Sequence, residues 1–274
     1  MSFREQLQSV LFSVAVTVIS KALLLRDRFT PGSVDRNLPS SARTIFFDSG
    51  DQRLVGSIVE ADETGPVLLI CHGIGEVVEY WGRVQQYLQD RGVSSMVFNY
   101  SGYGRSSGSI RALHCDRDLI SAYNEIRRRA GTQRLVFLLG FSMGSGVAAQ
   151  GAACLDPAIA GPFLCEAFTF FREATKAAGF PSWLARFAPD IWNTVNEVSR
   201  LTIPTYVVHS QADKLFPVSM AQEIATACGQ NGEMVLLSRA AHDDIYRRPS
   251  DEYRLPIVNR VHAAAAMSRL TPAE

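Results

Sequence analysis

Two short stretches of this 274-residue sequence place a serine between glycines: GRSSG at residues 104–108 and GFSMG at residues 140–144. Both match the pattern G-x-S-x-G, in which a serine at the apex of a strand-to-helix turn acts as a nucleophile. A serine hydroxyl is a weak nucleophile, so this chemistry also needs a base and a carboxylate that orients the base. The nucleophile must therefore be identified from the sequence that surrounds each serine and from the residues that could act as base and acid.

The surrounding sequence favours Ser142. An apolar run from Leu135 to Leu139 predicts a buried strand directly before it, and small residues from Ser145 to Cys154 predict a helix directly after it. Glycines at 140 and 144 leave room where strand and helix pass each other, because glycine lacks Cβ. Ser106 instead lies in a loop rich in serine and glycine, several residues before the next predicted helix. We therefore predict that Ser142 is the nucleophile.

Asp213 and His242 are the predicted acid and base. Asp213 follows the apolar strand predicted at 205–208, and His242 follows the strand predicted at 234–237. The order Ser, Asp, His along the chain is one that such triads use when the nucleophile follows a strand. Asp243 and Asp244 come directly after His242, where a side chain orients the neighbouring imidazole poorly. These observations favour Asp213.

Acyl transfer also needs two donors for the oxyanion of the tetrahedral intermediate. The backbone N–H of Met143, directly after the nucleophile, is the first predicted donor. The loop after the first long buried strand should provide the second, and here it reads CHGIG at residues 71–75. Ile74 is the preferred donor and Gly73 the second choice, while His72 is expected to brace the loop.

The elements that must position these residues alternate between strands and helices. Strands are predicted at 44–47, 54–59, 67–71, 95–100, 135–139, 163–168, 205–208 and 234–237, and helices at 80–90, 113–129, 145–154, 218–227 and 256–266. Such alternation predicts an α/β domain with a mostly parallel central sheet, helices on both faces and one site at the carboxyl ends of the strands. We assign this domain to residues 43–270, with a short lid-like insert at 170–200.

Composition excludes several functions. The 27 basic residues balance the 27 acidic ones and form no extended basic tract, so nucleic acid is not expected as a partner. Five scattered cysteines without a CxxC motif predict neither a disulfide framework nor a zinc site, and they suit a reducing, cytoplasmic environment. No cofactor or metal is expected.

The N-terminal segment, residues 1–30, contains a mostly apolar stretch at 7–25. It is interrupted by polar residues and by Lys21, which favours a helix docked on protein, on a partner or on a membrane surface. An uncleaved anchor and a cleaved signal are the alternatives. Arg26 and Arg28 follow the stretch, so insertion would leave the catalytic domain in the cytoplasm.

Residues 43–265 resemble the α/β-hydrolase superfamily. The motifs that carry the resemblance are CHGIGE, NYSGYGRSSG, GFSMGSG, HSQADKLFP and AAHDD. The most similar branch is that of compact serine hydrolases, which includes bacterial esterases and protein depalmitoylases. This resemblance implies hydrolysis of carboxylic esters or thioesters without a cofactor, on a small-molecule substrate.

The insert is rich in aromatic residues, among them Phe171, Phe180, Trp183 and Trp192. One interpretation is a small lid that lines an acyl pocket, with Trp183 and Trp192 joined by Tyr80 and Trp81; the other is helices that pack on the core. Two alternatives to an esterase also stay open: a peptidase or perhydrolase with the same triad, and a non-catalytic binding protein on this fold. Acyl length, leaving group and oligomeric state do not follow from the sequence.

Overall fold

The computed structural model describes Val10, Ser13, Val14 and residues 37–186, 188, 191–248 and 250–270. Its centre is an eight-stranded sheet with the order β1-β2-β4-β3-β5-β6-β7-β8. The strands are β1 (Arg43–Ser49), β2 (Gln52–Val59), β3 (Val67–Cys71), β4 (Ser94–Phe98), β5 (Val136–Phe141), β6 (Gly161–Cys165), β7 (Thr205–Ser210) and β8 (Gly232–Leu237). β2 runs antiparallel to β1 and β4, and all other pairs are parallel.

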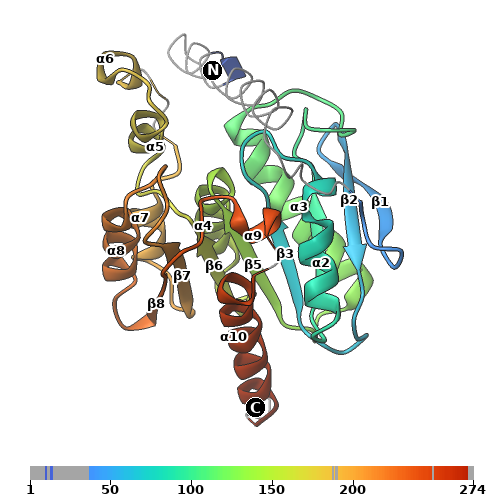
Figure 1. Ribbon diagram of the computed structural model, residues 1–274. Coiled ribbons are helices and arrows are strands. Elements are labelled where there is room, and N and C mark those ends of the chain that lie inside the picture. Colours follow the sequence, from blue (N-terminus) through green and yellow to red (C-terminus); the bar gives the residue numbers. More distant parts are fainter. Residues whose placement is uncertain are drawn as a thin grey trace.

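Helices cover both faces of the sheet (Figure 1). They are η1 (Val78–Trp81), α2 (Gly82–Gln89), α3 (Ala112–Ala130), α4 (Met143–Leu155), α5 (Phe171–Ala177), α6 (Ser182–Ala185), α7 (Thr194–Val198), α8 (Val218–Ala227), η2 (Gly229–Asn231), α9 (Asp244–Arg247) and α10 (Asp251–Leu270). One apolar cluster joins the sheet to α3, α4, α7 and α8, and a second joins its other face to α2, α9 and α10. This architecture confirms the predicted fold class.

The central strands explain why the sequence alternation predicts this sheet. β3, β4, β5 and β6 are buried at every residue, as expected of parallel strands covered on both faces. Along β3, Leu68 and Ile70 face one cluster, whereas Leu69 and Cys71 face the other. The edge strand β1 instead alternates between exposed and buried residues.

Several predicted boundaries differ from the structure. The strand predicted at 163–168 ends at Cys165, because Glu166 has a φ of +44° that takes the chain out of the sheet. The helix predicted at 80–90 is a 3₁₀ turn, η1, followed by α2. The last helix begins at Asp251, so Pro256 lies inside α10 and not at its start.

The predicted insert contains α5, α6 and α7, and α5 and α6 stand above α7 and α8 in the view of Figure 1. The predicted apolar helix at 7–25 lies almost wholly outside the described residues. Within that segment, Ser13 Oγ donates a 2.6 Å hydrogen bond to the Ile110 carbonyl. Among the helices that the structure describes, none is both long and apolar enough to cross a membrane.

Candidate active site

Ser142 lies between β5 and α4, at a turn that only small neighbours permit. Its φ is +51°, a left-handed conformation that residues with side chains rarely adopt. A Cβ on Gly140 would lie 2.3 Å from the Gly144 carbonyl oxygen, and a Cβ on Gly144 would lie 2.0 Å from the Cys71 carbonyl oxygen. Helix α4 therefore lies so close to β5 at Gly140, and to the end of β3 at Gly144, that neither glycine can carry a side chain.

His242 and Asp213 converge on Ser142 from two loops at the carboxyl ends of β8 and β7. Ser142 Oγ is 3.1 Å from His242 Nε2, and His242 Nδ1 is 2.8 Å from Asp213 Oδ2. Because the Asp213 carboxylate is an acceptor, Nδ1 carries the ring proton and Nε2 accepts from the serine hydroxyl. The structure thus brings the three predicted residues together in one hydrogen-bonded chain.

The acid of this trio is held as a carboxylate. Burial on its own would raise the pKa of Asp213, but the hydrogen bond and charge of His242, together with hydrogen bonds from Glu166 and the Leu215 N–H, outweigh burial and lower that pKa to about 2. The other carboxylate oxygen accepts the N–H groups of Leu215 and Phe216 at 2.6 and 3.2 Å. The rings of Phe141 and Phe216 pack against the imidazole with centroids 5.2 and 5.3 Å away. The base is therefore oriented by packing as well as by Asp213.

Two residues whose backbone N–H groups are predicted to stabilise an oxyanion, Met143 and Ile74, lie near Ser142. Met143 is the first residue of α4, so its N–H has no acceptor within the helix. Met143 and Ile74 both line the pocket that contains Ser142. The Gly73 N–H, by contrast, donates to Glu76 Oε2 at 2.9 Å. This bond corrects the second choice of donor and leaves Ile74 as the candidate from this loop.

Glu76 has a bracing function that the sequence does not predict. It is 5% exposed, and its Oε2 accepts from Trp81 Nε1 at 3.0 Å as well as from Gly73. Burial raises the pKa of Glu76 to about 8. Glu76 directly follows the loop at residues 71–75, where a glutamate is typical of the first turn of a helix. The sequence therefore gives no clear sign of this role.

Two other histidines brace the loops that hold the site. His72 Nδ1 lies 2.8 Å from the Gly73 carbonyl, and burial lowers the pKa of His72 to about 4, so the ring stays neutral. His209 Nε2 lies 3.1 Å from the Phe216 carbonyl, which ties β7 to the loop of the triad acid. The placement of His72 agrees with the bracing role predicted for it.

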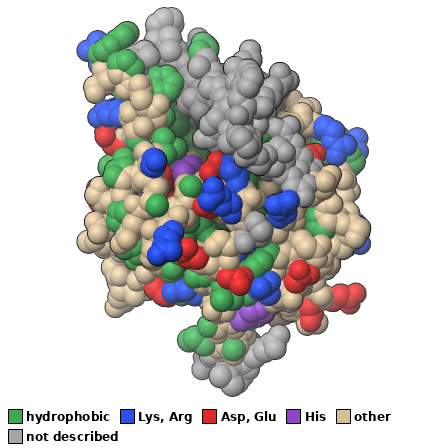
Figure 2. Space-filling model, in the orientation of Figure 1, with side chains coloured by type: hydrophobic (Ala, Val, Ile, Leu, Met, Phe, Trp, Pro, Cys, Tyr) green, Lys and Arg blue, Asp and Glu red, His purple; other side chains and the backbone are tan. Residues whose placement is uncertain are grey.

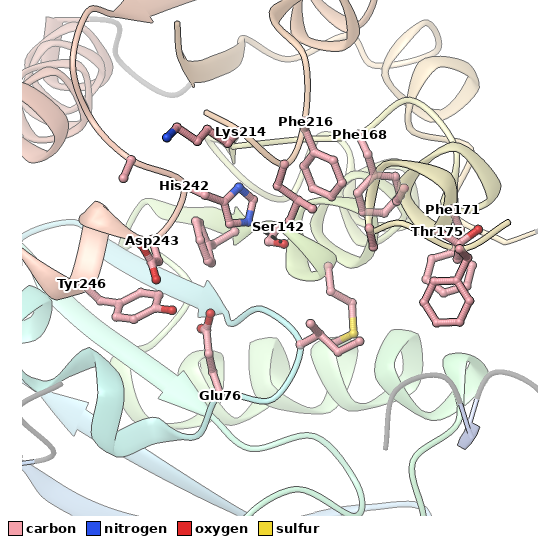
Figure 3. A pocket seen from close by; sticks show the side chains of 18 of the residues that line it. Glu76, Ser142, Phe168, Phe171, Thr175, Lys214, Phe216, His242, Asp243 and Tyr246 are labelled. Atoms are coloured by element: carbon pink, nitrogen blue, oxygen red, sulfur yellow. Dashed lines mark hydrogen bonds between the residues drawn. The ribbon is translucent and has the colours of Figure 1, made fainter. Parts of the chain in front are cut away.

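Ser142 and His242 open into a pocket of about 770 Å³. Its lining residues are Ile74, Glu76, Phe141, Ser142, Met143, Phe168, Phe171, Ala174, Thr175, Ala178, Phe180, Ala212, Lys214, Leu215, Phe216, Ala241, His242, Asp243 and Tyr246. Phe168 and Phe171 lie on one side of the catalytic pair, and Glu76, Asp243 and Tyr246 lie on the other (Figure 3). The pocket therefore has an apolar side and a polar side.

The surface around this pocket is mixed in charge. Figure 2 shows hydrophobic side chains in the hollow below α5 and α6, with lysine or arginine and acidic side chains interspersed over the same face. This pattern suits a small substrate with an apolar part better than a polyanion.

The four aromatic residues predicted to bind substrate lie elsewhere. Tyr80 and Trp81 are 3% and 0% exposed and pack against Tyr246. Trp192 is 1% exposed and donates to Asp116 Oδ1 at 2.9 Å. Trp183 is 65% exposed at the outer end of the insert.

None of these four side chains lines the pocket among the described residues, so this prediction is corrected. Phenylalanines take their place, and two of them, Phe171 and Phe180, belong to the insert whose aromatic content suggested a lid. The Phe171 side chain points from α5 into the pocket, and the Trp183 side chain points to solvent. The sequence contains no signal that distinguishes these two orientations.

Glu166, Asp213 and His242 form a cluster whose polar atoms all lie within 4.8 Å of one another. Such a set can resemble a metal site. Here His242 already bonds both the Asp213 carboxylate and Ser142 Oγ, so two of the three members belong to the hydrogen-bonded chain that ends at Ser142.

Comparison with known proteins agrees with this geometry. A family model of the alpha/beta hydrolase fold matches residues 66–191. This protein has the α/β-hydrolase fold. The predicted fold and the resemblance to that superfamily are thereby confirmed.

Relatives and solved structures are similar over most of the domain. The uncharacterized protein YfhR of Escherichia coli O157:H7 is 27% identical over 248 residues, covering 82% of each chain. The lysophosphatidylserine lipase ABHD12 of Danio rerio is 26% identical over 185 residues, which are 61% of this chain and 48% of the lipase. The esterase Pf2001 of Pyrococcus furiosus superposes with a TM-score of 0.65 at 19% identity, covering 81% of this chain and 92% of the esterase.

Proposed function

We propose that this α/β-hydrolase-fold protein hydrolyses carboxylic esters or thioesters through an acyl-enzyme on Ser142. One observation carries the proposal: Ser142 Oγ lies 3.1 Å from His242 Nε2, and the far nitrogen of that ring is 2.8 Å from Asp213. The strained serine backbone and the pocket that opens directly onto this trio add support. The names of two similar proteins, a lipase and an esterase, agree with this class of substrate.

In this proposal, each group has one role. His242 Nε2 takes the hydroxyl proton as Ser142 Oγ attacks the acyl carbon, and Asp213 stabilises the imidazolium that forms. The N–H groups of Met143 and Ile74 stabilise the oxyanion. His242 then gives its proton to the leaving alcohol or thiol. Water attacks the acyl-enzyme with His242 again as base, which returns Ser142 to its resting form.

In this proposal, the two sides of the pocket hold different parts of the substrate. The phenylalanine-lined side suits an apolar acyl group, and the side of Glu76 and Tyr246 suits a polar leaving group. A volume of about 770 Å³ lies within the range of roughly 300–1,000 Å³ that small-molecule pockets occupy. We therefore place the substrate among small esters or thioesters with an apolar acyl chain.

Hydrolysis of p-nitrophenyl esters from acetyl to palmitoyl tests this proposal. The wild-type protein should show a rate maximum at one chain length. Phe171→Ala should move that maximum to longer chains, since the phenyl ring limits the apolar side. Trp183→Ala is the matched control, because this side chain lies in the same insert but points to solvent.

The outcomes separate the alternatives. No turnover of any ester or acyl thioester, with cleavage of an aminoacyl anilide, would replace the proposal with a peptidase. An unchanged chain-length profile in Phe171→Ala would contradict the placement of the acyl group.

A further inference from the structure

Glu166 is a buried acid directly behind the catalytic trio. It follows the last residue of β6, its side chain is 0% exposed, and its φ is +44°. A left-handed backbone at a residue other than glycine is strained, and such strain concentrates at functional sites. The carboxyl group lies within 4.8 Å of polar atoms of both Asp213 and His242. Its position and its strained backbone both point to a role in the site.

Two adjacent buried carboxyl groups do not both ionise, because their charges repel and neither is solvated. Asp213 receives three donors, namely His242 Nδ1 and the N–H groups of Leu215 and Phe216. Glu166 receives the Ser210 N–H on Oε2 at 3.2 Å, while its Oε1 has no donor among the described residues. The donors therefore favour charge on Asp213 and a proton on Glu166.

The other groups that face Glu166 bring no positive charge to it. His209 Nδ1 lies 3.3 Å from Glu166 Oε2, but its ring donates through Nε2 to Phe216 and burial lowers the pKa of His209, so it brings no positive charge. The buried hydroxyl of Tyr253 approaches from α10 and lowers the pKa of Glu166, but burial and Asp213 raise that pKa by more. No lysine or arginine of the described chain lies within ion-pair distance of this carboxyl group.

We propose that Glu166 is a protonated positioning residue that donates a hydrogen bond to the Asp213 carboxylate and so holds the triad acid in place. This inference rests on the proposed function, since it adds a fourth member to the Ser142–His242–Asp213 arrangement. Burial raises the pKa of Glu166 to about 9, and the hydrogen bond and negative charge of Asp213 act in the same direction. Because Glu166 is neutral, only the negative charge of Asp213 lies behind His242. Two ionised carboxylates would put two negative charges there.

Infrared difference spectroscopy of the intact protein tests the protonation directly. The spectrum of wild type minus Glu166→Gln at pH 7 should show the carbonyl band of a protonated carboxylic acid, which shifts in D₂O and fades as the pH rises through about 9. Glu125→Gln is the matched control, because Glu125 is 8% exposed yet paired with Arg128 and Arg129. Its difference spectrum should show carboxylate bands instead.

Kinetics test the positioning role. Glutamine keeps a neutral donor, so Glu166→Gln should hold kcat/KM within about threefold of wild type, with the same acid limb of the pH profile. Glu166→Leu removes the hydrogen-bond donor to Asp213. The Asp213 carboxylate then stabilises the protonated form of His242 more strongly. In this variant kcat/KM should fall at least tenfold and the acid limb should move to higher pH. If Glu166 had a purely structural role, Glu166→Leu would lower the amount of folded protein but leave the acid limb of the pH profile unchanged.

Either of two results overturns the inference: absence of the protonated-acid band from the Glu166→Gln difference spectrum, or a Glu166→Leu profile that superposes on wild type. The infrared result depends on no activity, so it stands even if Glu166→Leu fails to fold. It is also distinct from a failure of the proposed function, which would show as unchanged ester turnover in Ser142→Ala.

Discussion

The two G-x-S-x-G stretches have the same spacing and opposite roles. In GFSMG, Ser142 Oγ faces His242 at the mouth of a pocket. In GRSSG, Ser106 Oγ donates to the Asn99 carbonyl at 2.8 Å and accepts the Val55 N–H at 2.9 Å. One hydroxyl is thus directed at a base, and the other links a loop to β2. The difference arises from what flanks each stretch, because only GFSMG joins a buried strand directly to a helix.

Removing each hydroxyl should give the largest contrast. Ser142→Ala should lower kcat for ester hydrolysis by about 10⁴-fold or more, because it deletes the nucleophile. Ser106→Ala should keep kcat within about threefold and instead lower the free energy of unfolding by about 1–2 kcal/mol, since it leaves a buried N–H and C=O without their partner. Ester kinetics and urea unfolding of both variants provide the measurements. Equal activity loss in the two would break the contrast.

The acids near the two stretches should differ in the same way. Asp213→Asn presents an amide N–H to His242 Nδ1 and favours the wrong tautomer, so kcat should fall about 10³–10⁴-fold. Asp118 is also wholly buried, but it accepts from Ser49 Oγ at 2.6 Å and from the Ser101 N–H at 2.7 Å in the loop that leads to GRSSG. Asp118→Asn should therefore reduce stability and leave kcat of the folded protein near wild type.

The glycines of the elbow should tolerate no side chain. A Cβ at Gly144 would meet the Cys71 carbonyl oxygen at 2.0 Å, so Gly144→Ala should destabilise the protein by about 3 kcal/mol or more. Gly131 has a φ of +72°, but a Cβ there would have no other atom within 4 Å, so Gly131→Ala should cost about 1 kcal/mol from backbone strain alone. Urea unfolding compares the two, and equal costs would contradict the close approach of strand and helix.

Buried acids around the elbow should make stability depend on pH. The pKa of Glu166 is raised to about 9 from 4.5, so between these values the folded protein holds a proton that the unfolded chain lacks. This group therefore lowers the free energy of unfolding as the pH rises from about 5 to 9. Glu166→Gln should make the decline between pH 6 and 8 shallower by about 1.4 kcal/mol per pH unit. An unchanged slope would show that Glu166 is ionised.

The sequence predicts the fold, and it predicts that Ser142, Asp213 and His242 meet at one site, because both depend on local signals. Apolar runs such as 67–71 identify buried strands, and Ser142, Asp213 and His242 each follow such a run. The pocket wall was less predictable, since the side on which Phe171 or Trp183 points depends on how the insert packs. Glu76 and Glu166 were missed because burial of an acid is a tertiary property, and neither residue has a local sign of it.

The most direct test of the central claim is to treat the intact protein with a fluorophosphonate probe and map the modified peptide by mass spectrometry. The account predicts one adduct, on Ser142, that is absent in Ser142→Ala and retained in Ser106→Ala. An adduct on Ser106, or ester hydrolysis without any adduct on Ser142, would contradict it.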